Sequence, residues 1–143
     1  MFKFKSTAFA CIMVLAGSPI AAADAVADFP VEAASAAMAT GDIPAAVGYL
    51  MDDAVFTALP TPGRWEKTSL VGKDEIGGWW EFLAADNSTL SVKDLKLDGD
   101  RATFVGVFHG DHFRSKGIGP VELDGVAILR GGKIQALVFA GRP

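Results

Sequence analysis

Apolar residues follow helical spacing most clearly in one stretch near the middle of the chain. Ile76, Trp79, Trp80 and Leu83 stand at the i, i+3, i+4 and i+7 positions of a single helix face, a stripe typical of a helix packed on a core. Gly77-Gly78 interrupts this helix, and each glycine costs about 1 kcal/mol relative to alanine. We therefore expect a helix here, with another element packed closely against the two glycines.

Two more helices are predicted nearer the N-terminus. Residues 31–40 are rich in strong helix formers, and Asp28 is placed to cap them. Gly41 ends this segment, and Asp42 can cap a second, short helix whose helical spacing reaches Met51.

The remaining pattern is typical of strands. Residues 54–59 are interpreted as a strand of mixed burial and residues 64–71 as an irregular loop. Four further strands are expected at 90–97, 102–109, 121–129 and 133–140, joined by a tight turn at 98–100, a glycine-rich loop and a turn at 131–132. Three N-terminal helices followed by an antiparallel meander predict an α+β domain.

The first strand of this meander changes its parity halfway along. Apolar residues alternate at Leu90 and Val92 and then resume at Leu95 and Leu97. One extra residue in between is what a β-bulge produces, and a bulged strand bends. We expect a sheet that curves around the helix packed on it.

The first residues have the three-part pattern of an export signal. Two lysines precede the almost entirely apolar stretch 7–17, and small residues follow. This stretch is shorter than the roughly 20 apolar residues that span a bilayer. We expect residues 1–23 to be a signal peptide, cleaved after Ala23 or Ala25, and residues 24–143 to form one exported domain, periplasmic or secreted, without membrane contact. An uncleaved anchor or a buried N-terminal helix is the alternative.

Cysteine usage and charge exclude several classes of partner and site. Cys11 lies within the predicted signal, so the domain is expected to lack disulfides, thiolate metal ligands and a cysteine nucleophile. The chain has 13 basic and 17 acidic residues and a net charge of −4, which becomes −6 once Lys3 and Lys5 are removed. A surface of this sign repels phosphate backbones and argues against nucleic-acid binding.

The order of elements and several short segments resemble the NTF2-like superfamily and its SnoaL-like branch. The segments are 41–43, 50–56, 71–76 and 131–134, and the resemblance covers roughly residues 28–141. It implies a cone of three helices and a curved antiparallel sheet around an internal cavity, and relatives often dimerise through the open sheet face. Members range from polyketide cyclases, ketosteroid isomerases and epoxide hydrolases to proteins that only bind, so the fold does not name a function.

The two histidines of the chain are the first candidates for acid–base chemistry. His109 and His112 flank Asp111 at a predicted strand end, where a carboxylate can orient an imidazole for proton transfer. Residues 110–112 also resemble the stretch around the histidine of the polyketide-cyclase branch, where an aspartate and a histidine do acid–base work. The alternative is that both histidines face water. Three ligands within four residues rarely converge on one ion, so no metal site is expected.

Two carboxylates on the next strand are the second candidates. Glu122 and Asp124 share a strand face with Val126 and Ile128. A carboxylate in an apolar cavity has a raised pKa and can act as a general base. Solvation of both groups at the strand end is the alternative.

Aromatic residues form the predicted lining of the cavity. They are Phe56, Trp65, Trp79, Trp80, Phe104, Phe108 and Phe139. Phe104 and Phe108 share a strand face and make the best pair, whereas the helical stripe of Trp79 and Trp80 favours a core role over a ligand-binding one.

Three functions stay open at this point. The chain has no nucleotide-binding glycine pattern and no serine-nucleophile elbow. We favour binding of a small, partly apolar molecule in an internal cavity. An isomerase, cyclase or dehydratase that needs no cofactor and uses a histidine or carboxylate base is the first alternative. A homodimer or another protein partner held at the sheet face is the second.

Overall fold

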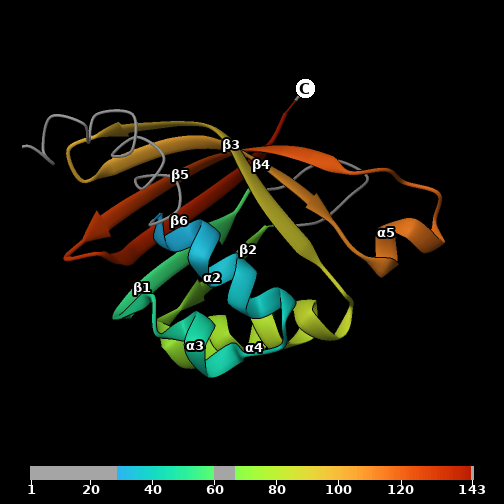
Figure 1. The fold of residues 1–143 in the computed structure, drawn as a ribbon, viewed down its shortest axis with the longest axis horizontal. Coiled ribbons are helices and arrows are strands. Elements are labelled where there is room, and N and C mark those ends of the chain that lie inside the picture. The colour runs from blue at the N-terminus through green and yellow to red at the C-terminus, as the bar shows by residue number, and fades with distance from the viewer. Residues whose placement is uncertain (1–28, 60–66, 143) are drawn as a thin grey trace, which may run out of the picture.

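The computed structural model describes residues 29–59 and 67–142 as an α+β domain in which three helices lie against one face of a curved sheet (Figure 1). The predicted signal peptide, the Asp28 cap and Trp65 lie outside the described residues. In the described part of the chain, no helix has the length and apolar character needed to span a membrane.

All three predicted N-terminal helices are present. They are α2 (Pro30–Ala39), α3 (Ile43–Val47) and α4 (Gly72–Ala85). The Asp42 side chain caps α3 by accepting a hydrogen bond from the Ala45 N–H at 3.2 Å, as expected from the sequence. Gly41, which ends α2, has a φ of +81°, a conformation that glycine adopts at little steric cost. The prediction that α3 reaches Met51 is wrong, because Leu50 already pairs with Ile134 in the sheet.

Six strands form one sheet in the order β2-β1-β6-β5-β4-β3. The strands are β1 (Leu50–Ala58), β2 (Thr68–Val71), β3 (Thr89–Asp98), β4 (Arg101–His109), β5 (Val121–Arg130) and β6 (Lys133–Gly141). All neighbours are antiparallel except β1 and β6, which are parallel. The meander of β3 to β6 matches the prediction within one residue at each end.

Two elements were not predicted. The edge strand β2 lies where an irregular loop was expected, and its four residues are too few to give a periodic signal. The short helix α5 (Asp111–Ser115) lies in the predicted glycine-rich loop. Both are held by contacts with distant parts of the chain, which local pattern does not report.

The predicted β-bulge is confirmed. The register of β3 against β4 shifts between Lys93 and Lys96, and Asp94 has a φ of +55°. Figure 1 shows β3 running as a long bent strand with α2 in front of the sheet. Curvature of this kind separates the middle of the sheet from α4 and leaves room for a cavity.

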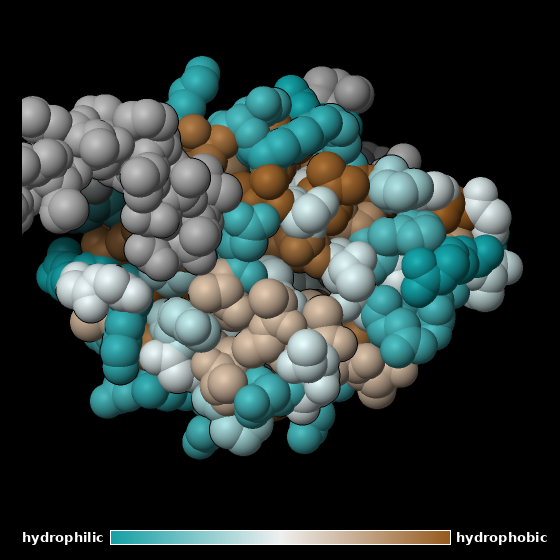
Figure 2. Space-filling view, in the orientation of Figure 1, coloured by the Kyte–Doolittle hydropathy of each residue, from teal (hydrophilic) through white to brown (hydrophobic). Residues whose placement is uncertain are grey.

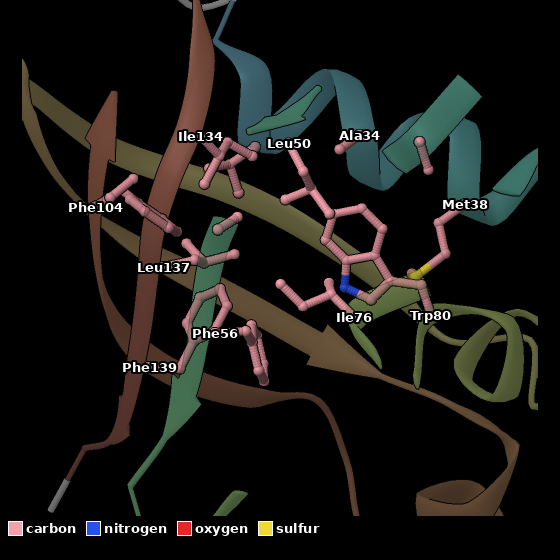
Figure 3. Packing of buried hydrophobic residues seen from close by; sticks show 14 of the residues in the cluster. Ala34, Met38, Leu50, Phe56, Ile76, Trp80, Phe104, Ile134, Leu137 and Phe139 are labelled. Atoms are coloured by element: carbon pink, nitrogen blue, oxygen red, sulfur yellow. The ribbon is translucent and has the colours of Figure 1, made fainter. Parts of the chain in front are cut away.

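The concave face of the sheet and the three helices share one apolar core. Figure 3 shows Phe56, Leu137 and Phe139 on the strands facing Trp80 on α4 and Met38 on α2. The outer surface of α2 is mostly small and only weakly apolar, and it forms the pale brown area at the centre of Figure 2.

The two glycines of α4 have different environments. A Cβ on Gly77 would lie 3.0 Å from Cγ1 of Val47 on α3, which confirms the expected close packing there. A Cβ on Gly78 would have no atom within 4 Å, so for this glycine the prediction of a close neighbour is wrong.

Candidate functional site

A cavity of about 310 Å³ lies between the concave face of the sheet and helices α2 and α4. Its apolar lining comes from every layer of the fold. The lining includes Val31, Ala34 and Met38 of α2; Trp79, Trp80, Phe82 and Leu83 of α4; Phe113 of α5; and Phe56, Ala58, Leu90, Phe108, Leu123, Ile134, Leu137 and Phe139 of the sheet. Four residues add polar side chains, namely Ser35, Thr68, Asp86 and His112.

Five of the seven aromatic residues singled out from the sequence line this cavity. They are Phe56, Trp79, Trp80, Phe108 and Phe139. Phe104 lies deeper in the core, where its ring makes edge contacts with Phe29 at 5.3 Å and Phe139 at 5.7 Å. Whether the five bind a ligand stays a prediction.

Phe82 is an aromatic residue that the sequence analysis did not select. Its ring stacks on Trp79 with centroids 5.4 Å apart, and 61% of the residue is exposed. A large exposed aromatic residue in the lining places this pair where the cavity meets solvent. The sequence pattern does not indicate that Phe82 reaches the cavity, because Phe82 lies outside the apolar stripe of α4.

Strand parity separates His109, one of the predicted catalytic residues, from the cavity. Phe108 of β4 lines the cavity, and Phe104 and Gly106 on the same strand face pack against Phe139, so the alternate residues, which include Val105 and His109, face the opposite, convex side. His109 is therefore outside the cavity. Alternation along β4 puts Val105 and His109 on one face, and the packing of the helices decides that this face is the outer one.

His109 and Asp111 belong to an Arg114-centred clasp that holds α5. The Arg114 guanidinium donates to Nδ1 of His109 at 2.9 Å and to Oδ1 of Asp111 at 2.7 Å. Because a guanidinium only donates, Nδ1 must accept, and the proton of the neutral ring is on Nε2, which donates to the Ile118 carbonyl at 3.1 Å. Asn87 completes the clasp by donating to Oδ2 of Asp111 at 2.6 Å.

Because of the clasp, the stability of the folded domain is expected to depend on pH. Hydrogen bonds from Arg114, and then from Asn87, hold the pKa of Asp111 below its ordinary value of 3.8. A lowered pKa means that the stabilisation is present above that value and is lost as the pH falls through the lowered pKa. We expect Asp111→Asn to lower the Tm by a few degrees near neutral pH, with the difference shrinking below about pH 4.

Thermal unfolding followed by circular dichroism at a series of pH values tests this expectation. Asp53→Asn is the matched control, because Asp53 is exposed on β1 and the described structure records no ion pair for it. A Tm difference for Asp111→Asn that persists unchanged at pH 2 to 3 would contradict the role given to its ionised carboxylate.

Glu122 and Asp124 also lie outside the cavity. Both are exposed on the convex face of β5. Glu122 bonds Lys93 at 2.6 Å and Arg142 at 3.0 Å, and Asp124 lies 3.3 Å from Arg142. The bond from Lys93 lowers the pKa of Glu122, the opposite of the raised pKa expected for a carboxylate in an apolar cavity. The structure thus favours the solvated alternative for this pair.

One end of the cavity carries its ionisable groups. Asp86, directly after α4, and His112 on α5 both contribute to the lining. The Asp86 carboxylate accepts the His112 backbone N–H at 3.1 and 3.3 Å and the Ser88 hydroxyl at 3.3 Å. The Asp86 carbonyl accepts the Asp111 N–H at 2.9 Å. Asp86 therefore holds the start of α5 and at the same time faces the cavity.

Asp86 is not among the residues that the sequence pattern indicates, because an aspartate directly after a helix is typical of a helix end. Close packing around it gives the reason for the nearby glycine: a Cβ on Gly110 would lie 2.7 Å from Oδ2 of Asp86 and 2.6 Å from Oγ of Ser88. Within residues 29–59 and 67–142, no cluster of three or more side chains suited to hold a metal ion was found.

Comparison with solved structures identifies the fold. An NTF2-like protein of unknown function from Cytophaga hutchinsonii aligns with a TM-score of 0.61 at 17% identity, over 80% of this chain and 88% of that one. A candidate polyketide cyclase from Sinorhizobium meliloti aligns with a TM-score of 0.60 at 22% identity, over 77% and 92%. TerC, co-crystallised with polyporic acid, aligns with a TM-score of 0.62 at 14% identity, over 79% and 88%.

These identities are low, so the structural matches establish the NTF2-like fold and not an activity. No curated protein sequence matches the chain. The SnoaL-like domain model matches residues 31–136, a span that begins in α2 and ends in β6 and so includes every element around the cavity. The chain belongs to the SnoaL-like domain family.

Proposed function

We propose that this domain is exported and binds a small, partly apolar molecule in its internal cavity. The observation that carries the proposal is the cavity of about 310 Å³ with an almost entirely apolar and aromatic lining. Ligand sites commonly measure about 300–1,000 Å³ and combine such a lining with a few polar groups. Export rests on the signal-like pattern of residues 1–23, and a dimer through the open sheet face stays a prediction.

Burial of apolar surface supplies the driving force for such binding. Each Å² of apolar ligand surface removed from water contributes about 25 cal/mol, and the rings of Trp80, Phe108 and Phe139 offer flat surfaces for an aromatic or polycyclic body. TerC, the structural neighbour co-crystallised with polyporic acid, supports the idea that this fold accommodates a small molecule.

Titration with N-phenyl-1-naphthylamine, an uncharged apolar dye that fluoresces when it leaves water, tests the proposal. We expect saturable binding of one dye per domain. Ala58 lies on β1 at the cavity, and Ala58→Phe is expected to weaken dye binding at least tenfold because the new ring occupies the space. Thr57→Phe, one residue away on the opposite strand face, is the control and should leave binding unchanged. Equal dye binding by both variants and the wild type would rule out this cavity as the site.

Proton transfer on a bound carbonyl compound is the second candidate. The specific observation in its favour is that Asp86 and His112 lie at the same end of the cavity, where one can take a proton and the other can hold a developing oxyanion. Deuterium exchange into 2-tetralone in D₂O, followed by NMR, measures this activity. Exchange above the buffer rate that is lost in His112→Gln supports catalysis, and exchange at the buffer rate with all proteins leaves binding as the function.

A further inference from the structure

The Asp86 carboxylate is the acidic side chain of the described cavity lining, and no cation in the described structure neutralises it. Its oxygens accept only the His112 N–H and the Ser88 hydroxyl, and none of the ion pairs recorded for residues 29–59 and 67–142 involves Asp86. Two carboxylate oxygens offer about four acceptor positions. Acceptor capacity therefore remains at the polar end of an otherwise apolar cavity.

The surroundings of Asp86 also favour positive charge. Asp86 is the C-cap of the 14-residue helix α4, and the partial negative charge of a helix C-terminus attracts cations. The lining contains no lysine or arginine among the described residues. Two rings near this end, Phe108 and Phe113, meet edge to face at 5.8 Å, and aromatic faces attract cations.

His112 is the group that could oppose this preference. Its backbone N–H is already used by the Asp86 carboxylate, so that dipole is not available to attract an anion. Its imidazole is exposed, and a neutral imidazole offers an acceptor to a cation as well as a donor. Measurements at about pH 8, above the ordinary range of histidine, keep its charge out of the comparison.

We propose that the ligand of this cavity carries a positively charged amino group that pairs with Asp86 and an apolar body that fills the aromatic part of the cavity. This inference rests on the proposed binding function and specifies its ligand class. An ammonium group donates hydrogen bonds to the remaining lone pairs of Asp86, and a charge-assisted bond at a partly desolvated site is stronger than a neutral one. A carboxylate ligand of the same shape would be repelled.

Calorimetric titration with three matched probes tests the inference. The probes are 1-naphthylmethylamine, 1-naphthylmethanol and 1-naphthoic acid, which have similar apolar bodies and differ in head group. We expect the amine to bind the wild-type domain at least about tenfold more tightly than the alcohol, and the acid to bind most weakly. This comparison needs no variant and is independent of any change in folding.

Asp86→Asn assigns the preference to one side chain. The amide oxygen of asparagine can still accept the His112 N–H, so α5 keeps its support while the charge is removed. We expect this variant to lose about tenfold in affinity for the amine and little for the alcohol. Glu81→Gln removes the same charge from an exposed position on α4 outside the lining and should leave all three affinities unchanged.

The outcomes distinguish a failure of the cationic-ligand inference from a failure of the proposed binding function. If the alcohol or the acid binds as tightly as the amine, or if Asp86→Asn binds the amine like the wild type, the cationic ligand class is wrong and the apolar cavity stands. The same conclusion follows if N-phenyl-1-naphthylamine binds and the amine does not. If neither the dye nor any of the three probes binds, the proposed binding function fails and the inference fails with it.

Discussion

Replacing Trp80 with alanine is expected to lower the free energy of unfolding by about 3–5 kcal/mol. Trp80 is 7% exposed, and Figure 3 shows its indole between α2 and the strands, close to Met38 and Ala34. Alanine removes most of the buried apolar surface of this side chain and enlarges a cavity that already exists, and the surrounding layers can collapse only partly. Urea unfolding followed by far-ultraviolet circular dichroism gives the free energy without depending on tryptophan fluorescence.

The adjacent tryptophan provides the matched control. Trp79 is only half-buried and stacks on the exposed ring of Phe82, so Trp79→Ala should cost about 1–2 kcal/mol. The chemical change is the same in both variants, and only the environment differs. Similar losses in the two variants would contradict the central position assigned to Trp80.

A methyl group added at Gly125 is expected to destabilise the domain by about 2–3 kcal/mol. Gly125 lies opposite Phe104 on the neighbouring strand, and a Cβ there would lie 2.4–2.9 Å from three atoms of the Phe104 ring. The ring has little freedom to move, because it is 3% exposed and is held between Phe29 and Phe139. The Phe104 ring therefore packs directly over the backbone of Gly125. Aromatic residues are known to pair with glycines across neighbouring strands in this way.

A double-mutant cycle tests the cause of this loss. Phe104→Leu alone should destabilise the domain, but it replaces the ring with a smaller side chain, so Gly125→Ala should then cost much less than in the wild type. Gly119→Ala is the control, because a Cβ on Gly119 would have no atom within 4 Å. Additive effects of the two substitutions would show that the ring contact is not what limits position 125.

Local pattern was sufficient wherever neighbours along the chain decide the conformation. The stripe on α4, the Asp42 cap and the parity change in β3 each depend on a few consecutive residues, and each is confirmed. The last hairpin is another example, since Gly131 and Gly132 both have positive φ, which a two-residue turn of this type requires. Such features are encoded by short-range sterics and hydrogen bonds, so they can be read before the fold is known.

The candidate site could be predicted only in part. Alternation established that Phe104 and Phe108 share one face of β4 and that His109 lies on the other. It could not establish which face is inside, because that depends on where the helices pack. The histidine and aspartate that looked catalytic in sequence became parts of a clasp, since Arg114 one turn of α5 later offers its guanidinium to both.

The helices, the bulged meander and the family resemblance all follow from the amino-acid sequence. The tertiary structure alone decided that β2 completes the sheet edge, that Phe82 reaches the cavity and that Asp86 meets α5. The contact between Asp86 and His112 joins residues 26 positions apart, and β2 exists only because β1 pairs with it. Contacts of this kind produce no periodic pattern in the sequence of either segment. Neither segment is stable in its observed conformation until packing brings the two together.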